Sequence, residues 1–130
     1  MSIGRLRALL AAIAVALICT GVASAHQIAV NNGVEVTVHI APNDEPVAGE
    51  PAAILFPKIK TRTGKFAWAN CRCVLQVSDS AGKALLKAPA TSRTEFTFPD
   101  PAAYQITLSG RVLRKGKWAA FKVAFAYRAD

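Results

Sequence analysis

The sequence has little of the chemistry that most enzymes use. Its 130 residues include two histidines, three cysteines and one methionine, the initiator Met1. It contains no nucleophile motif with a matching base and no glycine-rich loop of the kind that holds a phosphate. Glu35 and His39 are the nearest acid–base pair, but on a strand they stand four positions apart, beyond direct contact. The sequence therefore predicts a binding or accessory protein without catalysis.

Acidic residues are also missing from the first part of the chain, which carries the features of an export signal. Three parts follow in order: a positive region at Arg5 and Arg7, an apolar run over 8–19, and small residues at 23–25. This order is typical of a secretory signal peptide, so we expect residues 1–25 to be removed on export. Cleavage would leave His26 as the first residue of a periplasmic or secreted protein.

Two alternatives to cleavage are weaker. An uncleaved membrane anchor built from Ala8 to Ala25 would be only just long enough to cross a bilayer, and small polar residues dilute its end. A lipid anchor on Cys19 needs a small side chain before the cysteine, where this sequence has Ile18. Contact with a membrane is expected only through an uncleaved signal.

Basic residues are absent from the start of the mature chain. Residues 26–50 hold four acidic residues and no lysine or arginine, whereas residues 51–130 hold 14 basic and four acidic residues. In an exported protein this basic excess favours an anionic surface, such as lipid headgroups or a cell-wall polymer, or an acidic envelope protein over a nucleic acid. A solvated sheet surface that keeps the protein soluble is the alternative explanation.

Beyond residue 25 the pattern predicts strands and no helix. The clearest strand is Val34–Ile40, in which apolar and polar residues alternate without fault. Further strands are predicted at 53–60, 66–77, 83–86, 94–98, 104–108 and 121–127. Pro57 would remove a ladder donor from its strand and so predicts an edge position or a bulge. About seven short strands predict one antiparallel, immunoglobulin-like β-sandwich domain over residues 26–130.

Tyr104 carries a further sign of this fold. It follows Pro-Ala-Ala and begins an alternating strand, which resembles the tyrosine of immunoglobulin-like domains whose hydroxyl ties a corner to nearby backbone. An immunoglobulin proper pairs two cysteines across its sheets, whereas Cys71 and Cys73 lie on one segment here.

Cys71 and Cys73 allow three interpretations: a disulfide, local or with a partner; a copper(I) thiolate site; or two packed thiols. An oxidising compartment favours the first. Residues two apart on a regular strand stand too far apart for good disulfide geometry, so a bond between them predicts a bulge or turn, which Trp68-Ala69-Asn70 would supply. A labile bond would permit thiol–disulfide exchange with a partner.

His26 is the strongest candidate for a metal ligand. At a free N-terminus it offers an amine nitrogen and an imidazole nitrogen to one ion, an arrangement that suits copper. His39 is the second histidine and points from the polar face of its strand. The copper hypothesis predicts that His26 and His39 converge, with Cys71 and Cys73 as further candidate ligands.

The chain resembles small periplasmic copper-binding sandwiches of the CopC type in its signal, its first mature residue and its strand number. The resemblance implies an immunoglobulin-like barrel and copper binding through His26, with His39 as a candidate partner. The chain has no methionine after Met1, so the methionine-rich copper(I) site of some members has no counterpart. The Glu-Pro-Val-Ala-Gly-Glu-Pro stretch at 45–51 also resembles YtkA-like exported domains.

Two other surfaces are candidates for binding. The aromatic residues Phe66, Trp68 and Trp118 lie near lysines in the sequence, as in surfaces that bind a glycan or lipid, although aromatic residues beside turns more often cover a core. Edge strands or the basic turn 114–117 are the expected contacts if the protein is an envelope-structural or protein-interaction domain that binds no metal.

Overall fold

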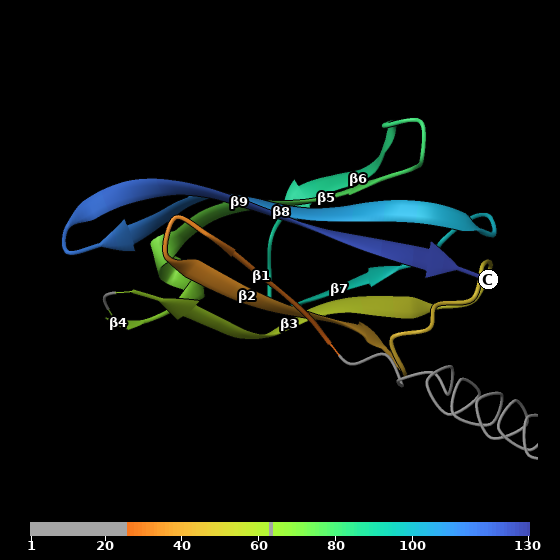
Figure 1. Cartoon of the computed structure of the whole chain (residues 1–130), viewed down its shortest axis with the longest axis horizontal. Helices are drawn as coiled ribbons and strands as arrows, with labels where there is room; N and C mark the ends of the chain where they lie inside the picture. Colours follow the sequence, from red (N-terminus) through yellow and green to blue (C-terminus); the bar gives the residue numbers. More distant parts are fainter. Residues whose placement is uncertain (1–25, 63) are drawn as a thin grey trace, which may run out of the picture.

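The computed structural model describes residues 26–62 and 64–130, which form a β-sandwich (Figure 1). The predicted signal peptide, residues 1–25, lies outside the described residues. The strands within the described part are β1 (Gln27–Asn31), β2 (Val34–Ala41), β3 (Ala52–Thr61), β4 (Gly64–Lys65), β5 (Cys71–Ser78), β6 (Ala84–Pro89), β7 (Arg93–Phe96), β8 (Ala102–Arg114) and β9 (Lys117–Ala129). A short 3₁₀ turn, η1 (Trp68–Asn70), precedes β5. In the described part, no helix has the length and apolar character to cross a membrane.

Two antiparallel sheets pack face to face around one core, which confirms the all-β sandwich. The first sheet has the order β1-β2-β3-β4, with β7 also paired to β3, and the second has the order β6-β5-β8-β9. Alternate residues of β2 are buried against the second sheet, as its sequence pattern predicted. The fully buried side chains come from both sheets and include Val36, Ile40, Leu75, Ile106 and Leu108.

Two strands, β1 and β4, go beyond the sequence prediction. Strand β1 runs along the edge of its sheet, and its large apolar residues point outward: Ile28 is 60% exposed and Val30 is 65% exposed. In β1 the large apolar side chains thus face solvent, whereas in a strand that covers the core they face inward. Strand β4 is only two residues long, too short to give a periodic signal.

Pro57 lies at an irregularity of β3, as expected. In the pairing of β2 with β3, Thr37 stands opposite Lys58 and His39 stands opposite Leu55. Two residues of β3 therefore face one residue of β2 between these pairs, which is the arrangement of a bulge. Pro57 thus avoids a regular ladder position although β3 is an inner strand.

Tyr104 ties a corner to the backbone, as its sequence context indicated. Its buried ring lies at the start of β8, and its hydroxyl donates a 2.6 Å hydrogen bond to the carbonyl oxygen of Asp100. The same hydroxyl accepts a 3.0 Å bond from the backbone N–H of Asp100. The hydroxyl therefore acts as both donor and acceptor, and the two hydrogen bonds hold the loop before β8 against the sandwich.

Amide side chains of the β1 segment cover the open edge of β9. Gln27 and Asn32 donate to the carbonyl oxygens of Ala126 and Ala120, each at 2.7 Å. The oxygen of the Asn31 side chain accepts a 2.9 Å bond from the backbone N–H of Lys122. These contacts satisfy edge groups that would otherwise be free to pair with another chain, and they hold β1 across the opening between the sheets.

Candidate metal centre

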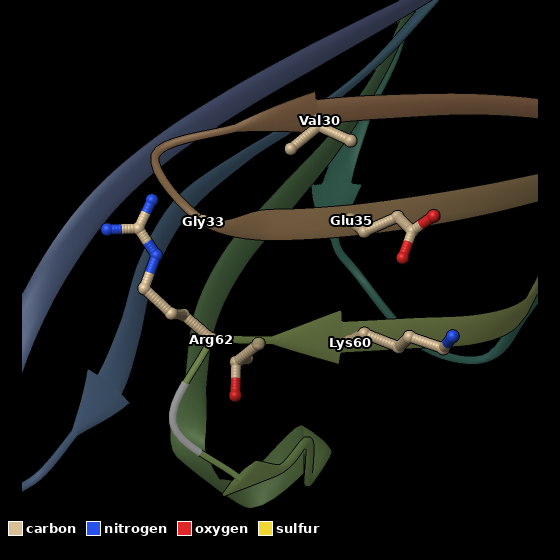
Figure 2. Close-up of a pocket in the computed structure, with 6 residues that line it drawn as sticks. Val30, Gly33, Glu35, Lys60 and Arg62 are labelled. Carbon is tan, nitrogen blue, oxygen red and sulfur yellow. The ribbon is translucent and has the colours of Figure 1, made fainter.

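The β1–β2 hairpin sets His26 opposite His39. Its connection is the two-residue turn Asn32-Gly33, with φ values of 47° and 73°, which is the geometry that favours a tight hairpin and that asparagine and glycine tolerate best. Figure 2 shows this turn at Gly33. The register pairs Gln27 with Val38, so the next position outward brings His26 to His39.

The two imidazole rings meet over one carboxylate. Their centroids lie 4.6 Å apart, with the rings inclined at 65°. The Nδ1 atom of His26 lies 2.8 Å from Oδ2 of Asp44, and the Nδ1 atom of His39 lies 2.9 Å from the same oxygen. The side chain of Asp44 is only 7% exposed, whereas that of His26 is 50% exposed. The cluster is therefore buried on the Asp44 side and open to solvent on the His26 side.

The turn that follows β2 places Asp44 beneath the rings. Asp44 has a left-handed backbone with φ of 61°, and its N–H donates a 2.7 Å bond to the carbonyl oxygen of Ile40. The N–H of Ile40 donates in return to Oδ1 of Asp44 at 2.8 Å. This reciprocal pair locks the carboxylate in position and leaves Oδ2 facing the two histidines.

The sequence reasoning missed Asp44 as a site residue. Asp44 lies five positions after His39, in a segment expected only to be a turn. Aspartate is one of the few residues that adopt positive φ readily, and a turn with such a residue reverses the chain onto the strand it leaves. An acidic residue in the turn directly after a strand that ends near a histidine is the signal that would have found it.

Competing effects set the ionisation of Asp44. Burial raises the pKa of its carboxyl group, but the hydrogen bond from the Ile40 backbone and those from His39 and His26 together outweigh burial. The net result is a pKa below the ordinary aspartate value. The centre therefore presents a carboxylate anion beside two imidazoles.

Tyr127 lies under this carboxylate. Its ring belongs to the core, and its hydroxyl has no hydrogen-bond partner within the described part of the chain. Burial raises the pKa of Tyr127, and the adjacent negative charge of Asp44 raises it further. A protonated, buried phenol thus lies close to the carboxylate.

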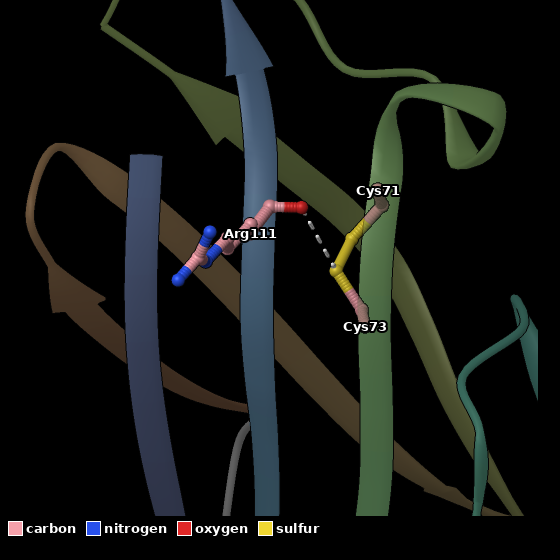
Figure 3. The surroundings of a disulfide bond; sticks show 3 residues. All are labelled: Cys71, Cys73 and Arg111. Atoms are coloured by element: carbon pink, nitrogen blue, oxygen red, sulfur yellow. Dashed lines mark hydrogen bonds between the residues drawn. A yellow bond between two sulfur atoms is a disulfide. The ribbon is translucent and has the colours of Figure 1, made fainter. Parts of the chain in front are cut away.

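Cys71 and Cys73 lie elsewhere, in the second sheet, and are joined by a disulfide (Figure 3). Cys71 pairs with Val112 near the β8–β9 turn, whereas the histidine cluster lies at the end of the sandwich where the loop after β2 bonds to the C-terminal Asp130. The structure therefore brings together His26, His39 and Asp44 and places both sulfur atoms apart from them.

Of the bulge or turn that the sequence predicted for this disulfide, the structure has the turn, η1, directly before Cys71, and no bulge at the two cysteines. The pairs of β5 with β8 run without a register shift past both cysteines. The strand is contracted instead, with the two Cα atoms 5.3 Å apart, less than two extended residues would span. The Sγ atom of Cys73 lies 3.9 Å from the carbonyl oxygen of Arg111 (Figure 3).

Gly110 makes room for this contracted strand. It stands opposite Cys73, and its φ is +149°. A β-carbon at this position would collide with the carbonyl oxygen of Arg72 and lie 2.7 Å from Cα of Cys73. Only glycine permits so close an approach of the two backbones.

His26, His39 and Asp44 each offer one ligand atom, and these atoms lie within 4.8 Å of one another. Two imidazole nitrogens and one carboxylate oxygen suit a divalent transition metal. Comparison of the chain with protein-family models, curated proteins and solved structures finds no match. The resemblance to CopC-type and YtkA-like proteins therefore stays a prediction.

Proposed function

We propose that this protein is an exported, non-enzymatic copper(II)-binding domain whose centre is formed by His26, His39 and Asp44. The observation that carries the proposal is the convergence of both Nδ1 atoms on Oδ2 of Asp44, at 2.8 and 2.9 Å. Signal cleavage would add a fourth ligand, the α-amine of His26. The set would then hold three nitrogens and one oxygen.

The spacing of these atoms supports a planar copper site. Two ligands bound at about 2.0 Å and at right angles lie about 2.8 Å apart. Each histidine–carboxylate distance is compatible with that value, and metal binding would displace the two protons that the imidazoles share with the carboxylate. Square-planar nitrogen and oxygen coordination is typical of copper(II).

The surroundings of Asp44 support the same proposal. Its carboxylate is held by the Ile40 backbone and kept ionised, and hydrogen bonds that fix a ligand in this way raise metal affinity in other proteins. The exposure of His26 leaves an entry path from solvent.

The test is a calorimetric titration of copper(II) into residues 26–130. This segment contains every described strand and the core, so it carries its own fold. We expect one tight site per chain. His39→Ala should weaken binding roughly a hundredfold or more, because it removes a ligand outright.

A chain that retains Ala25 before His26 is the matched control, because it moves the terminal amine and keeps all three side chains. We expect its affinity to fall as well. Equal affinity of the two chains would remove the amine from the site, and equal affinity of His39→Ala would refute the proposed centre. Absence of stoichiometric copper would favour a structural or protein-interaction role without metal.

A further inference from the structure

The end of the sandwich farthest from the histidine cluster gathers most of the positive charge. Three connections meet there: the turn 31–34, the connection from β3 to β4 and the β8–β9 turn. The side chain of Arg114 donates a 2.6 Å hydrogen bond to the carbonyl oxygen of Asn32. The backbone N–H of Arg62 donates a hydrogen bond to the carbonyl oxygen of Gly33. The basic residues on these segments and on the strand ends beside them are Lys60, Arg62, Lys65, Arg72, Arg111, Arg114, Lys115 and Lys117. We call these eight residues the basic end.

Two guanidinium groups converge at its centre. A β-carbon built on Gly33 would lie 3.0 Å from Nη1 of Arg114 and 3.2 Å from Nε of Arg62, so both groups flank one point. Figure 2 shows the side chain of Arg62 folded back toward the Gly33 turn. Like charges held this close repel each other, and they create a strong local attraction for an anion.

Within residues 26–62 and 64–130, neither arginine forms an ion pair with a carboxylate. Glu35 is the acidic residue nearest to them along the strands, and it stands opposite Lys60 in the sheet. A further like-charged pair adds to the excess, because Arg72 and Arg111 are direct cross-strand partners. Such pairs destabilise a sheet, so the basic end retains charge that the fold itself does not neutralise.

Apolar and aromatic groups border this charge. Val30 is 65% exposed and lines the same groove as Gly33, Lys60 and Arg62, with one acidic residue, Glu35, also in the lining. Trp118 lies beside the β8–β9 turn, with the guanidinium of Arg72 4.0 Å from the centre of its ring. Cationic side chains beside an exposed aliphatic residue of the first sheet and a half-buried tryptophan of the second suit the headgroup region of a bilayer.

We propose that the basic end is a docking surface for a membrane that carries anionic phospholipids, with Arg62 and Arg114 contacting one lipid phosphate together. Charge complementarity carries this choice, because a lipid surface presents many anions across the width of the three turns. Arginine matches phosphate oxygens with two parallel N–H donors. Docking needs neither His26 nor a metal, so it stands independently of the copper proposal.

Vesicle sedimentation with residues 26–130 and a metal chelator tests the proposal. We expect binding to vesicles of about three parts phosphatidylcholine to one part phosphatidylglycerol, little binding to phosphatidylcholine alone, and release by salt. Neutralising Arg62 and Arg114 to glutamine should weaken binding about fivefold for each charge removed. The pair Lys115→Gln and Lys117→Gln should act similarly, and both of these side chains are exposed, so their replacement should leave the fold intact.

The matched control is Lys83→Gln with Lys87→Gln, which removes two exposed charges from β6 and the turn before it, outside the basic end. This variant should bind almost as tightly as the parent chain. An equal loss in control and test variants would overturn the proposal, since only net charge would then matter. Equal binding to both vesicle types would also overturn it, as would binding to soluble polyglutamate without binding to the anionic vesicles.

Discussion

The two ends of the sandwich handle charge in opposite ways. At the histidine end, Asp44 accepts hydrogen bonds from two imidazoles and one backbone N–H. At the basic end, arginines face one another across the β5–β8 ladder and around Gly33, and no carboxylate among the described residues forms an ion pair with them. The first arrangement is compact and suits one small cation, whereas the second is spread over three turns and suits an extended anionic surface.

One hairpin links the two ends. The Asn32-Gly33 turn lies among the residues of the basic end. The register that this turn sets places His26 beside His39 at the other end of the sandwich. A shift of one residue in this register would move every side chain of β1 to the opposite face. The turn therefore positions residues for both proposed functions.

The largest expected effect on stability comes from replacing Gly110, which lies in the strand that carries Arg111 and Arg114 of the basic end. Gly110→Ala places a β-carbon against the Arg72–Cys73 backbone, so we expect the free energy of unfolding to fall by about 3 kcal/mol in urea titrations. Gly49→Ala is the control from the other end, because Gly49 also has positive φ (+79°) but no atom within 4 Å of its β-carbon position. It should cost only about 1 kcal/mol, and equal losses would show that close packing at Gly110 has no special role.

The second largest expected effect on stability comes from replacing Asp44 in the histidine cluster. Asp44→Asn removes the charge that accepts three hydrogen bonds, and we expect a loss of about 2 kcal/mol in the unfolding free energy of the metal-free protein near neutral pH. Because the pKa of Asp44 is lowered on folding, its stabilising effect is present above the ordinary aspartate pKa of about 3.9 and is lost as the pH falls through the folded value. The difference between parent and variant should therefore shrink in acid, and a difference that stays constant with pH would contradict this account of the carboxylate.

The smallest expected effect on stability comes from removing one of the like charges at the basic end. Arg111→Gln removes one of two like charges that face each other on β5 and β8. We expect this variant to be more stable by about 0.5 kcal/mol at low salt, with the gain lost at high salt. Thermal unfolding at two ionic strengths measures both quantities. A loss of stability at low salt would show that Arg111 is neutralised in the folded protein.

Local patterns predicted much of the fold. The alternation over Val34–Ile40 predicted β2 and its buried face, Pro57 predicted an irregularity, and Tyr104 predicted a tied corner, because each depends on a few neighbouring residues. Strand β1 was missed because its exposed apolar residues lie at a sheet edge. Of the bulge or turn expected beside the cysteines, the turn is present at Trp68–Asn70 and the bulge is not, and the close backbone approach there depends on Gly110, which lies far away in the sequence.

The candidate site was predicted in part. His26 and His39 followed from residue chemistry, and the Asn32-Gly33 turn midway between them would have predicted their pairing. Asp44 was missed because its role depends on a positive φ and on the reversal of the chain after β2. Sequence chemistry thus finds ligands on regular strands more readily than ligands that a turn delivers.

Electron paramagnetic resonance of copper(II) bound to residues 26–130 tests the central claim most directly. We predict an axial signal whose nitrogen couplings report two imidazoles and one amine, and in which one imidazole is lost in His39→Ala. A signal from a single imidazole that is unchanged in His39→Ala would show that copper binds only at the exposed terminus, and it would contradict the centre proposed from His26, His39 and Asp44.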